Sequence, residues 1–161
     1  MATIERHRYK KINNKWEIFE TATLHYEKIS YDEQTILKYK EKIINALTPD
    51  FLSKKYKEEN KKNPMYGHCY HATQAMYYLL NTDTLESYTA LDYKGTQHWW
   101  LKDKNNGLII DITADQYFSV KEKPPYDKGK IKNWYGWKNR PHKRTFKLIM
   151  KLMPESRLTI K

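Results

Sequence analysis

The segment 98–113, HWWLKDKNNGLIIDIT, constrains the fold of this chain more tightly than any other stretch. Two apolar runs flank Asn106 and Gly107, a residue pair that favours the tight turn of a β-hairpin. Because successive side chains of a strand point to opposite faces, one face of this hairpin is wholly apolar and is expected to face the core. That face consists of Trp99, Leu101, Leu108, Ile110 and Ile112.

The length of the hairpin loop decides which polar side chains meet. If the loop is the four-residue segment 104–107, His98 and Asp111 occupy diagonal positions on the other face of the hairpin. Such positions lie about 7–8 Å apart at Cα, which allows an imidazole to bond a carboxylate. A loop of odd length would move Asp111 to the opposite face. The facing pairs of the expected register are Asp103 with Leu108, Trp100 with Asp111, and His98 with Thr113.

The single cysteine of the chain, Cys69, begins a predicted helix over residues 69–80, and Gly67 permits a sharp entry into that helix. The positive end of a helix dipole favours a thiolate over a thiol. The backbone N–H of Cys69 is also placed to stabilise an oxyanion. The predicted apolar face of this helix consists of Cys69, Ala72, Met76, Leu79 and Leu80.

An imidazole held by a carboxylate supplies two of the three groups of a nucleophilic triad, and a thiol supplies the third. We therefore expect Cys69 to be the nucleophile, His98 the general base and Asp111 the group that orients His98. Trp100, on the same hairpin face as His98, is expected to contact substrate. A lone cysteine on an apolar helix face is also a common small core residue, so a buried, inert thiol stays an alternative.

The order of these residues resembles the papain-like and transglutaminase-like superfamily of cysteine enzymes. GHCYHATQAMYYLL (67–80) is similar to its catalytic helix, and segment 98–113 is similar to its catalytic hairpin. The resemblance implies hydrolysis or acyl transfer at an amide, ester or thioester, with no cofactor. It also implies an oxyanion-hole donor six residues before the nucleophile, where this chain has Asn63. The residues that flank the papain cysteine are absent, which argues against proteolysis more than against the triad.

Segment 64–150 is also similar to small bacterial and phage proteins that share an HWWL…D.TADQ signature and a Tyr/Gly-containing segment before a basic helix. This second resemblance implies no activity of its own. It does imply that further residues belong to the same site region and contact substrate. These residues are Asp115, Gln116, Tyr135 and Trp137.

Positive charge is concentrated at the end of the chain. Segment 121–161 carries thirteen Lys and Arg against three acidic residues, which is nearly the whole net charge of +11. Such a distribution is either an ordinary solvated surface or an electrostatic footprint for phosphates. We expect this segment to contact an anionic substrate or nucleic acid, with phosphate contacts from Arg140, Lys143 and Arg144.

Two other functions stay open. The first is a non-enzymatic protein that binds nucleic acid or an acidic partner through basic and aromatic residues of segment 121–161, including Trp134. The second is a zinc site that uses His68, Cys69, His71 and His98, although their spacing fits no strong zinc motif, so no metal is expected.

The remaining pattern predicts one α+β domain over 1–161 with an antiparallel sheet. We expect a strand and helices at 1–63, the catalytic core at 64–120, and a basic loop and helix at 121–161. The helices are predicted after a Ser30 cap, over 48–59 and from near Pro141, and the strands within 15–27 and over 85–91. No apolar signal core or membrane span is evident, so a cytoplasmic location is expected.

Overall fold

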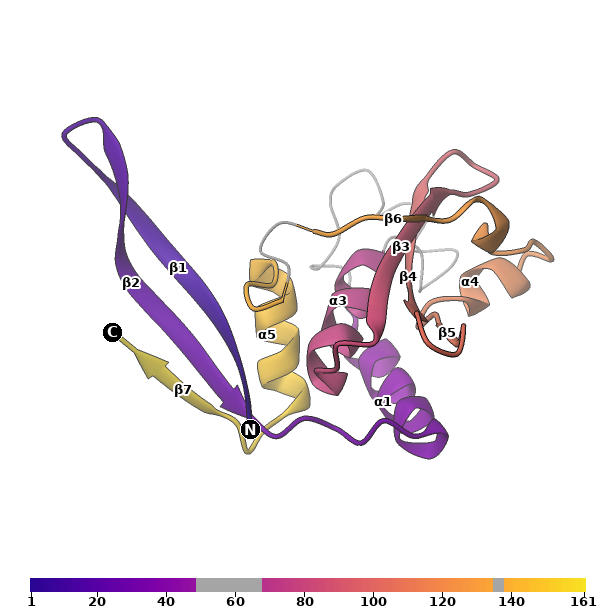
Figure 1. Ribbon diagram of the computed structural model, residues 1–161, viewed down its shortest axis with the longest axis horizontal. Coiled ribbons are helices and arrows are strands. Elements are labelled where there is room, and N and C mark those ends of the chain that lie inside the picture. The colour runs from indigo at the N-terminus through magenta and orange to yellow at the C-terminus, as the bar shows by residue number, and fades with distance from the viewer. Residues whose placement is uncertain (49–67, 135–137) are drawn as a thin grey trace.

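The computed structural model describes residues 1–48, 68–134 and 138–161. It confirms an α+β fold with antiparallel sheets: helices and a four-stranded sheet surround α3, and a long hairpin projects from this body (Figure 1). None of the described helices is long and apolar enough to span a membrane. The helices are α1 (Glu33–Ala46), α3 (Cys69–Leu80), α4 (Asp115–Phe118), the 3₁₀ turn η3 (Tyr126–Lys128) and α5 (Lys143–Leu152). The strands are β1 (Ala2–Ile12), β2 (Lys15–Tyr26), β3 (Leu85–Leu91), β4 (Gln97–Asp103), β5 (Ile109–Ile110), β6 (Lys130–Ile131) and β7 (Arg157–Ile160).

Helix α3 forms the centre of the core, and it begins and ends where the sequence predicts. The expected single apolar face is wrong, because every residue of α3 except Tyr70 is buried. Strand β4 packs on one side of α3, and α1 and α5 pack on others. Its polar side chains are bonded inside the core: Thr73 Oγ1 donates to the Trp99 carbonyl (3.1 Å), and Gln74 Oε1 accepts from the His142 backbone N–H (3.1 Å).

The four-stranded sheet has the order β5-β4-β3-β6, with every pair antiparallel. Leu101 pairs with Ile110, and the Asp103 N–H bonds the Leu108 carbonyl at 2.9 Å, which confirms the four-residue loop and its register. Leu108 is an exception to the predicted core face, since it is 44 % exposed at the end of the loop. Strand β5 is also short, because the chain turns toward α4 soon after Ile110.

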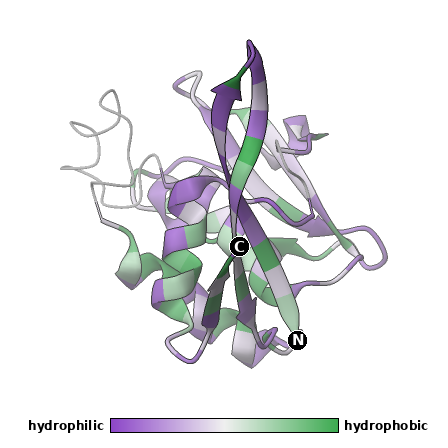
Figure 2. Ribbon diagram, turned by 90° about the vertical axis from the view of Figure 1, so that its left-hand side faces the viewer, coloured by the Kyte–Doolittle hydropathy of each residue, from purple (hydrophilic) through white to green (hydrophobic). Residues whose placement is uncertain are grey.

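The N-terminal hairpin is far longer than the short strand predicted within 15–27. Strands β1 and β2 pair along nearly their whole length and are joined at Asn13 and Asn14, whose φ angles are 50° and 64°. Asparagine tolerates this left-handed conformation, which two-residue hairpin turns of type I′ require. The free end of the hairpin stands away from the body, and β7 pairs with the base of β2 (Figures 1 and 2).

One predicted helix boundary is corrected and another is confirmed. Helix α1 is capped by Asp32 rather than by Ser30, because the Asp32 carboxylate accepts the Thr35 N–H at 2.8 Å. The C-terminal helix begins at Lys143, two residues after Pro141, with His142 as its N-cap. The helix predicted over 48–59 lies outside the described residues except for Thr48.

Candidate active site

The candidate active site forms where the start of α3 meets the start of β4. Cys69 is the first residue of α3, His98 is the second residue of β4, and Asp111 directly follows β5. His98 Nε2 donates to Asp111 Oδ2 at 2.7 Å, which confirms the diagonal contact predicted from the loop length. Both side chains are almost completely buried, at 0 % and 3 % exposure. The carboxylate therefore fixes the imidazole in one orientation and tautomer.

Cys69 lies on the other side of the imidazole. The Cys69 thiol donates to the carbonyl of Gln97, the residue immediately before His98, with 3.6 Å between sulfur and oxygen. His98 Nδ1 makes no hydrogen bond to a described residue, but Cys69 lies near enough to His98 to raise the pKa of its ring. Since Nε2 is occupied by Asp111, Nδ1 is the ring nitrogen left to exchange a proton with the sulfur.

The pKa of His98 shows how strongly the site holds a proton. Burial alone lowers this pKa, but the hydrogen bonds and charges of Asp111 and Cys69 outweigh burial and raise it to about 10. The ordinary value for histidine is about 6.5. His98 is therefore an imidazolium at neutral pH when its partners are ionised. A cation between a thiol and a carboxylate is the arrangement that thiol nucleophiles use.

Two tyrosines that the sequence did not predict complete the site. The Tyr126 hydroxyl donates to Asp111 Oδ2 at 2.7 Å, and the Tyr117 ring stands edge-on to His98 with ring centroids 4.8 Å apart. Burial, together with nearby carboxylates, raises the pKa of both hydroxyls, so both stay neutral donors. Tyr117 directly follows the TADQ motif, which could have indicated it. Tyr126 begins the 3₁₀ turn η3, in a stretch whose sequence has no recognisable pattern.

Trp100 forms a wall of the site against the His98 ring. Its ring stacks on His98 with centroids 5.7 Å apart and is 1 % exposed. Gly129 covers it so closely that a Cβ there would lie 2.5 Å from the Trp100 ring. Direct contact with substrate, as predicted for Trp100, stays a prediction; the observed contacts are those of packing.

The other predicted substrate residues are dispersed. Gln116 is buried and its Nε2 donates to Thr113 Oγ1 at 2.9 Å, whereas Asp115 is exposed at the start of α4. Arg140 and Lys143 line a separate cleft with Arg6. Arg144 is half-buried at the start of α5. The predicted residues Asn63, Tyr135 and Trp137 lie outside the described residues.

His71, one of the residues of the zinc alternative, is bonded on another side of α3. His71 Nδ1 bonds Thr145 Oγ1 at 3.1 Å, on the side of α3 that faces α5. Within ranges 1–48, 68–134 and 138–161, no three His, Cys, Asp or Glu side chains are grouped closely enough to hold a metal ion.

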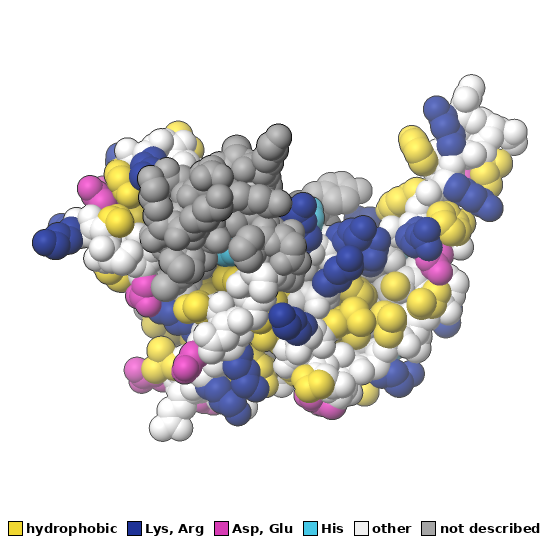
Figure 3. Space-filling view, turned by 180° about the vertical axis from the view of Figure 1, so that it is seen from behind, with side chains coloured by type: hydrophobic (Ala, Val, Ile, Leu, Met, Phe, Trp, Pro, Cys, Tyr) yellow, Lys and Arg dark blue, Asp and Glu magenta, His cyan; other side chains and the backbone are white. Residues whose placement is uncertain are grey.

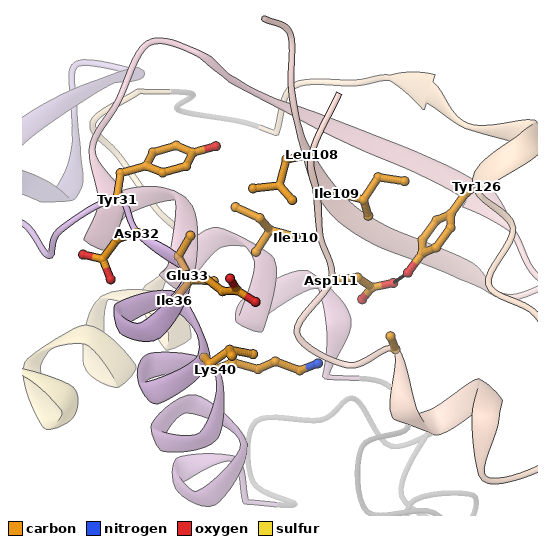
Figure 4. A pocket seen from close by; sticks show the side chains of 12 residues that line it. Tyr31, Asp32, Glu33, Ile36, Lys40, Leu108, Ile109, Ile110, Asp111 and Tyr126 are labelled. Atoms are coloured by element: carbon orange, nitrogen blue, oxygen red, sulfur yellow. Dashed lines mark hydrogen bonds between the residues drawn. The ribbon is translucent and has the colours of Figure 1, made fainter. Parts of the chain in front are cut away.

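A cavity of about 670 Å³ lies between α1 and β5 and reaches the carboxylate of the triad (Figure 4). Ile36 and Ile110 contribute to its apolar wall, and Asp111 and Tyr126 lie together at one end. The described residues that line it include neither Cys69 nor His98. This cavity therefore borders the orienting carboxylate rather than the sulfur.

A second groove, of about 630 Å³, lies along β3 and β6 and carries positive charge. Neither Cys69 nor His98 is among the described residues that line it. Its lining includes Lys128, Lys130 and Lys132, together with Gln97, whose carbonyl contacts the Cys69 thiol. Strand β6 brings these lysines to the edge of β3.

The acidic residue among the described groove residues, Asp92, is already bonded. Asp92 Oδ1 accepts the backbone N–H groups of Lys94 and Thr96 at 2.9 Å, and Oδ2 accepts the Tyr117 hydroxyl at 2.9 Å. Both carboxylate oxygens therefore already accept hydrogen bonds, one from the turn between β3 and β4 and the other from Tyr117. The three lysines give the groove a net positive charge.

Replacement of Asp111 by Asn tests the proton held on His98. The raised pKa of His98 contributes stability that is fully present below about pH 6.5 and is lost as pH rises through about 10. We expect wild type to exceed Asp111→Asn in unfolding free energy by roughly 1.5–3 kcal/mol at low pH, as for a bond to a charged group. Urea denaturation at about pH 6, 8 and 10 should show this difference shrinking. The exposed Asp115→Asn change is the matched control, and a difference that stays constant or grows with pH contradicts the assignment.

Comparisons with known proteins identify no relative of this chain. A scan against protein-family models, a search of curated proteins and a search of solved structures each find no match to this chain. The case for a function therefore rests on the geometry of Cys69, His98 and Asp111.

Proposed function

We propose that this protein is a thiol-dependent hydrolase or acyltransferase that acts on an amide, ester or thioester through Cys69, His98 and Asp111. The observation that carries the proposal is the 2.7 Å bond from His98 to Asp111 beside the cysteine at the start of α3. The arrangement of cysteine on a helix start, histidine on a strand and aspartate after the next strand supports a papain-like or transglutaminase-like core.

The reaction follows from the positions of the three groups. The Cys69 sulfur attacks the substrate carbonyl carbon while His98 Nδ1 holds the proton released by the thiol. The tetrahedral oxyanion then collapses, the bond to the leaving group breaks, and His98 returns its proton to that group. Water or an acceptor amine, hydroxyl or thiol next attacks the carbonyl carbon of the Cys69 thioester while His98 takes its proton as general base. The bond from that carbon to sulfur then breaks, the product leaves, and His98 returns the proton to Cys69. Asp111 orients the ring throughout and stabilises its positive charge.

The lysine groove favours an acyl donor that carries negative charge. Lys128, Lys130 and Lys132 line a groove whose lining also includes Gln97. The carbonyl of Gln97 contacts the Cys69 sulfur. An anionic group placed there would be attracted by all three side chains and would position the carbonyl near Cys69. This groove gives the basic segment 121–161 a role in substrate binding.

The competing interpretation, a non-enzymatic nucleic-acid binder that uses aromatic residues of segment 121–161, has less support. Trp134 is buried, and its indole N–H donates to the Tyr78 hydroxyl at 2.9 Å. Helix α5 buries Phe146 and Ile149 in the core. Among the described residues of this segment, the tryptophan therefore packs inside the protein.

Alkylation by iodoacetamide tests the thiol–imidazole pair. Because the chain has one cysteine, the added mass reports Cys69 alone. We expect wild type to react quickly at about pH 6.5 and His98→Ala to react about a hundredfold more slowly there, recovering only near pH 8.5, as for an unassisted thiol. His25→Ala, a histidine outside the site, should behave as wild type. Cys69 is only 7 % exposed, which makes its access to the reagent a real test. If the thiol reacts at no pH until the protein unfolds, the catalytic interpretation is wrong.

The charge of the groove is tested by comparing two alkylating reagents of similar size. Iodoacetate is anionic and iodoacetamide is neutral, so the ratio of their rates with Cys69 reports the local potential. We expect Lys128→Gln, Lys130→Gln and Lys132→Gln each to lower this ratio by roughly two- to fivefold, as for a screened charge acting over several ångströms. The exposed Lys38→Gln on α1 is the control. An unchanged ratio in the triple groove variant rules out the anionic donor and leaves the triad untouched.

A further inference from the structure

The outer part of the β1–β2 hairpin lacks the support that stabilises most strands. Strand β7 pairs with β2 only from Ala22 to His25, so beyond that point no third strand of the described residues lies beside the two (Figure 1). A two-stranded ribbon with no packed face is marginally stable in water. An element built this way is expected to gain a partner.

Aromatic and apolar side chains nevertheless cover this outer part. Trp16 is 70 % exposed, Ile18 51 %, Tyr9 45 % and Phe19 44 %. The pairing places Tyr9, Trp16 and Ile18 on one face, and Phe19 lies on the other beside a register shift. Exposed apolar side chains gathered on one projecting element indicate an interaction site (Figure 3).

The charges of the hairpin restrict the kind of partner. Segment 6–20 carries five Lys and Arg against two Glu. The cations lie among the rings: Arg8 lies over the Phe19 ring at 5.2 Å, and Lys11 over the Trp16 ring at 5.9 Å. Lysines on an edge strand disfavour pairing with a second copy, because like charges would face one another. The hairpin is therefore suited to a polyanion that also offers flat apolar surfaces.

A basic cleft continues this surface at the base of the hairpin. The cleft has a volume of about 300 Å³, and its described lining has three cations, Arg6, Arg140 and Lys143, and one acidic residue, Glu5. Figure 3 shows Lys and Arg side chains gathered where the hairpin joins the body.

His142, which also lines the cleft, responds to this charge. Burial and the neighbouring cations Arg144 and Lys143 lower its pKa. Three cations against one carboxylate give the described lining of the cleft a net positive charge, which would draw anions into it.

We propose that the cleft and the outer hairpin bind single-stranded nucleic acid. Phosphates contact Arg6 and Lys143, and unpaired bases stack on Trp16 and Phe19. Base stacking on aromatic rings next to cations is how proteins grip single strands without reading sequence, whereas the bases of a duplex are already stacked on each other. This binding site goes beyond the acyl chemistry and does not require the triad.

Fluorescence anisotropy with a labelled oligothymidine of about 16 nucleotides tests the proposal. We expect Trp16→Ala/Phe19→Ala to weaken binding roughly tenfold or more, and Arg6→Gln and Lys143→Gln each to reduce the salt slope by roughly 0.7. Tyr93→Ala and Lys38→Gln are the matched controls, since both residues are exposed away from the hairpin. Thermal unfolding of each variant establishes that it is folded.

The outcomes separate the possible partners. Tighter binding of the single strand than of its duplex and of poly-glutamate, lost in the hairpin variants, supports the proposal. Three results overturn it: no binding at low salt, equal binding of poly-glutamate, or a dimer in sedimentation that Trp16→Ala abolishes. Hairpin variants should keep wild-type alkylation of Cys69, and Cys69→Ser should keep its binding. Failure of this site is therefore distinguishable from failure of the proposed enzyme.

Discussion

The rest of the structure depends on the complete burial of helix α3. Because α1, α5 and β4 enclose it, α3 can neither slide nor rotate without breaking contacts on several sides. The polar residues Thr73 and Gln74 add directional restraints, since each bonds a backbone group of a neighbouring element. The start of α3 is thereby fixed against the start of β4. This constraint brings Cys69 to His98 across twenty-nine positions of sequence.

Asp111, the third residue of the site, is positioned by strand register rather than by helix packing. The four-residue loop at 104–107 sets β5 against β4, and this register alone places Asp111 diagonal to His98. Insertion of one residue in that loop would turn the carboxylate to the other face. Tyr126 and Tyr117 then enclose the pair, so that the imidazolium lies among a carboxylate, a thiol and neutral hydroxyls. Helix burial and strand register thus act together to assemble one proton-transfer site.

The features of the structure that the sequence predicted correctly are those that local residue spacing controls. Loop length fixed the His98–Asp111 contact, and helical spacing fixed both ends of α3, so both could be predicted without a structure. The burial of α3 on all sides could not, because the groups that bond Thr73 and Gln74 come from distant β4 and the start of α5. Strand β1 was missed although the Asn13 and Asn14 turn was visible, since its charged residues do not alternate with apolar ones. Tyr126 reaches the site through a loop whose path no periodicity encodes.

The central claim is that Cys69, His98 and Asp111 share one proton network. The most direct measurement is the titration of the His98 ring nitrogens by ¹⁵N nuclear magnetic resonance, in wild type and in Cys69→Ser. We expect wild-type His98 to carry protons on both nitrogens at neutral pH and to lose one only well above the ordinary histidine pKa of about 6.5. In Cys69→Ser this loss should occur at lower pH, because the interaction with Cys69 that raises the pKa of His98 is gone. A His98 that titrates near 6.5 and is indifferent to the cysteine would contradict the account.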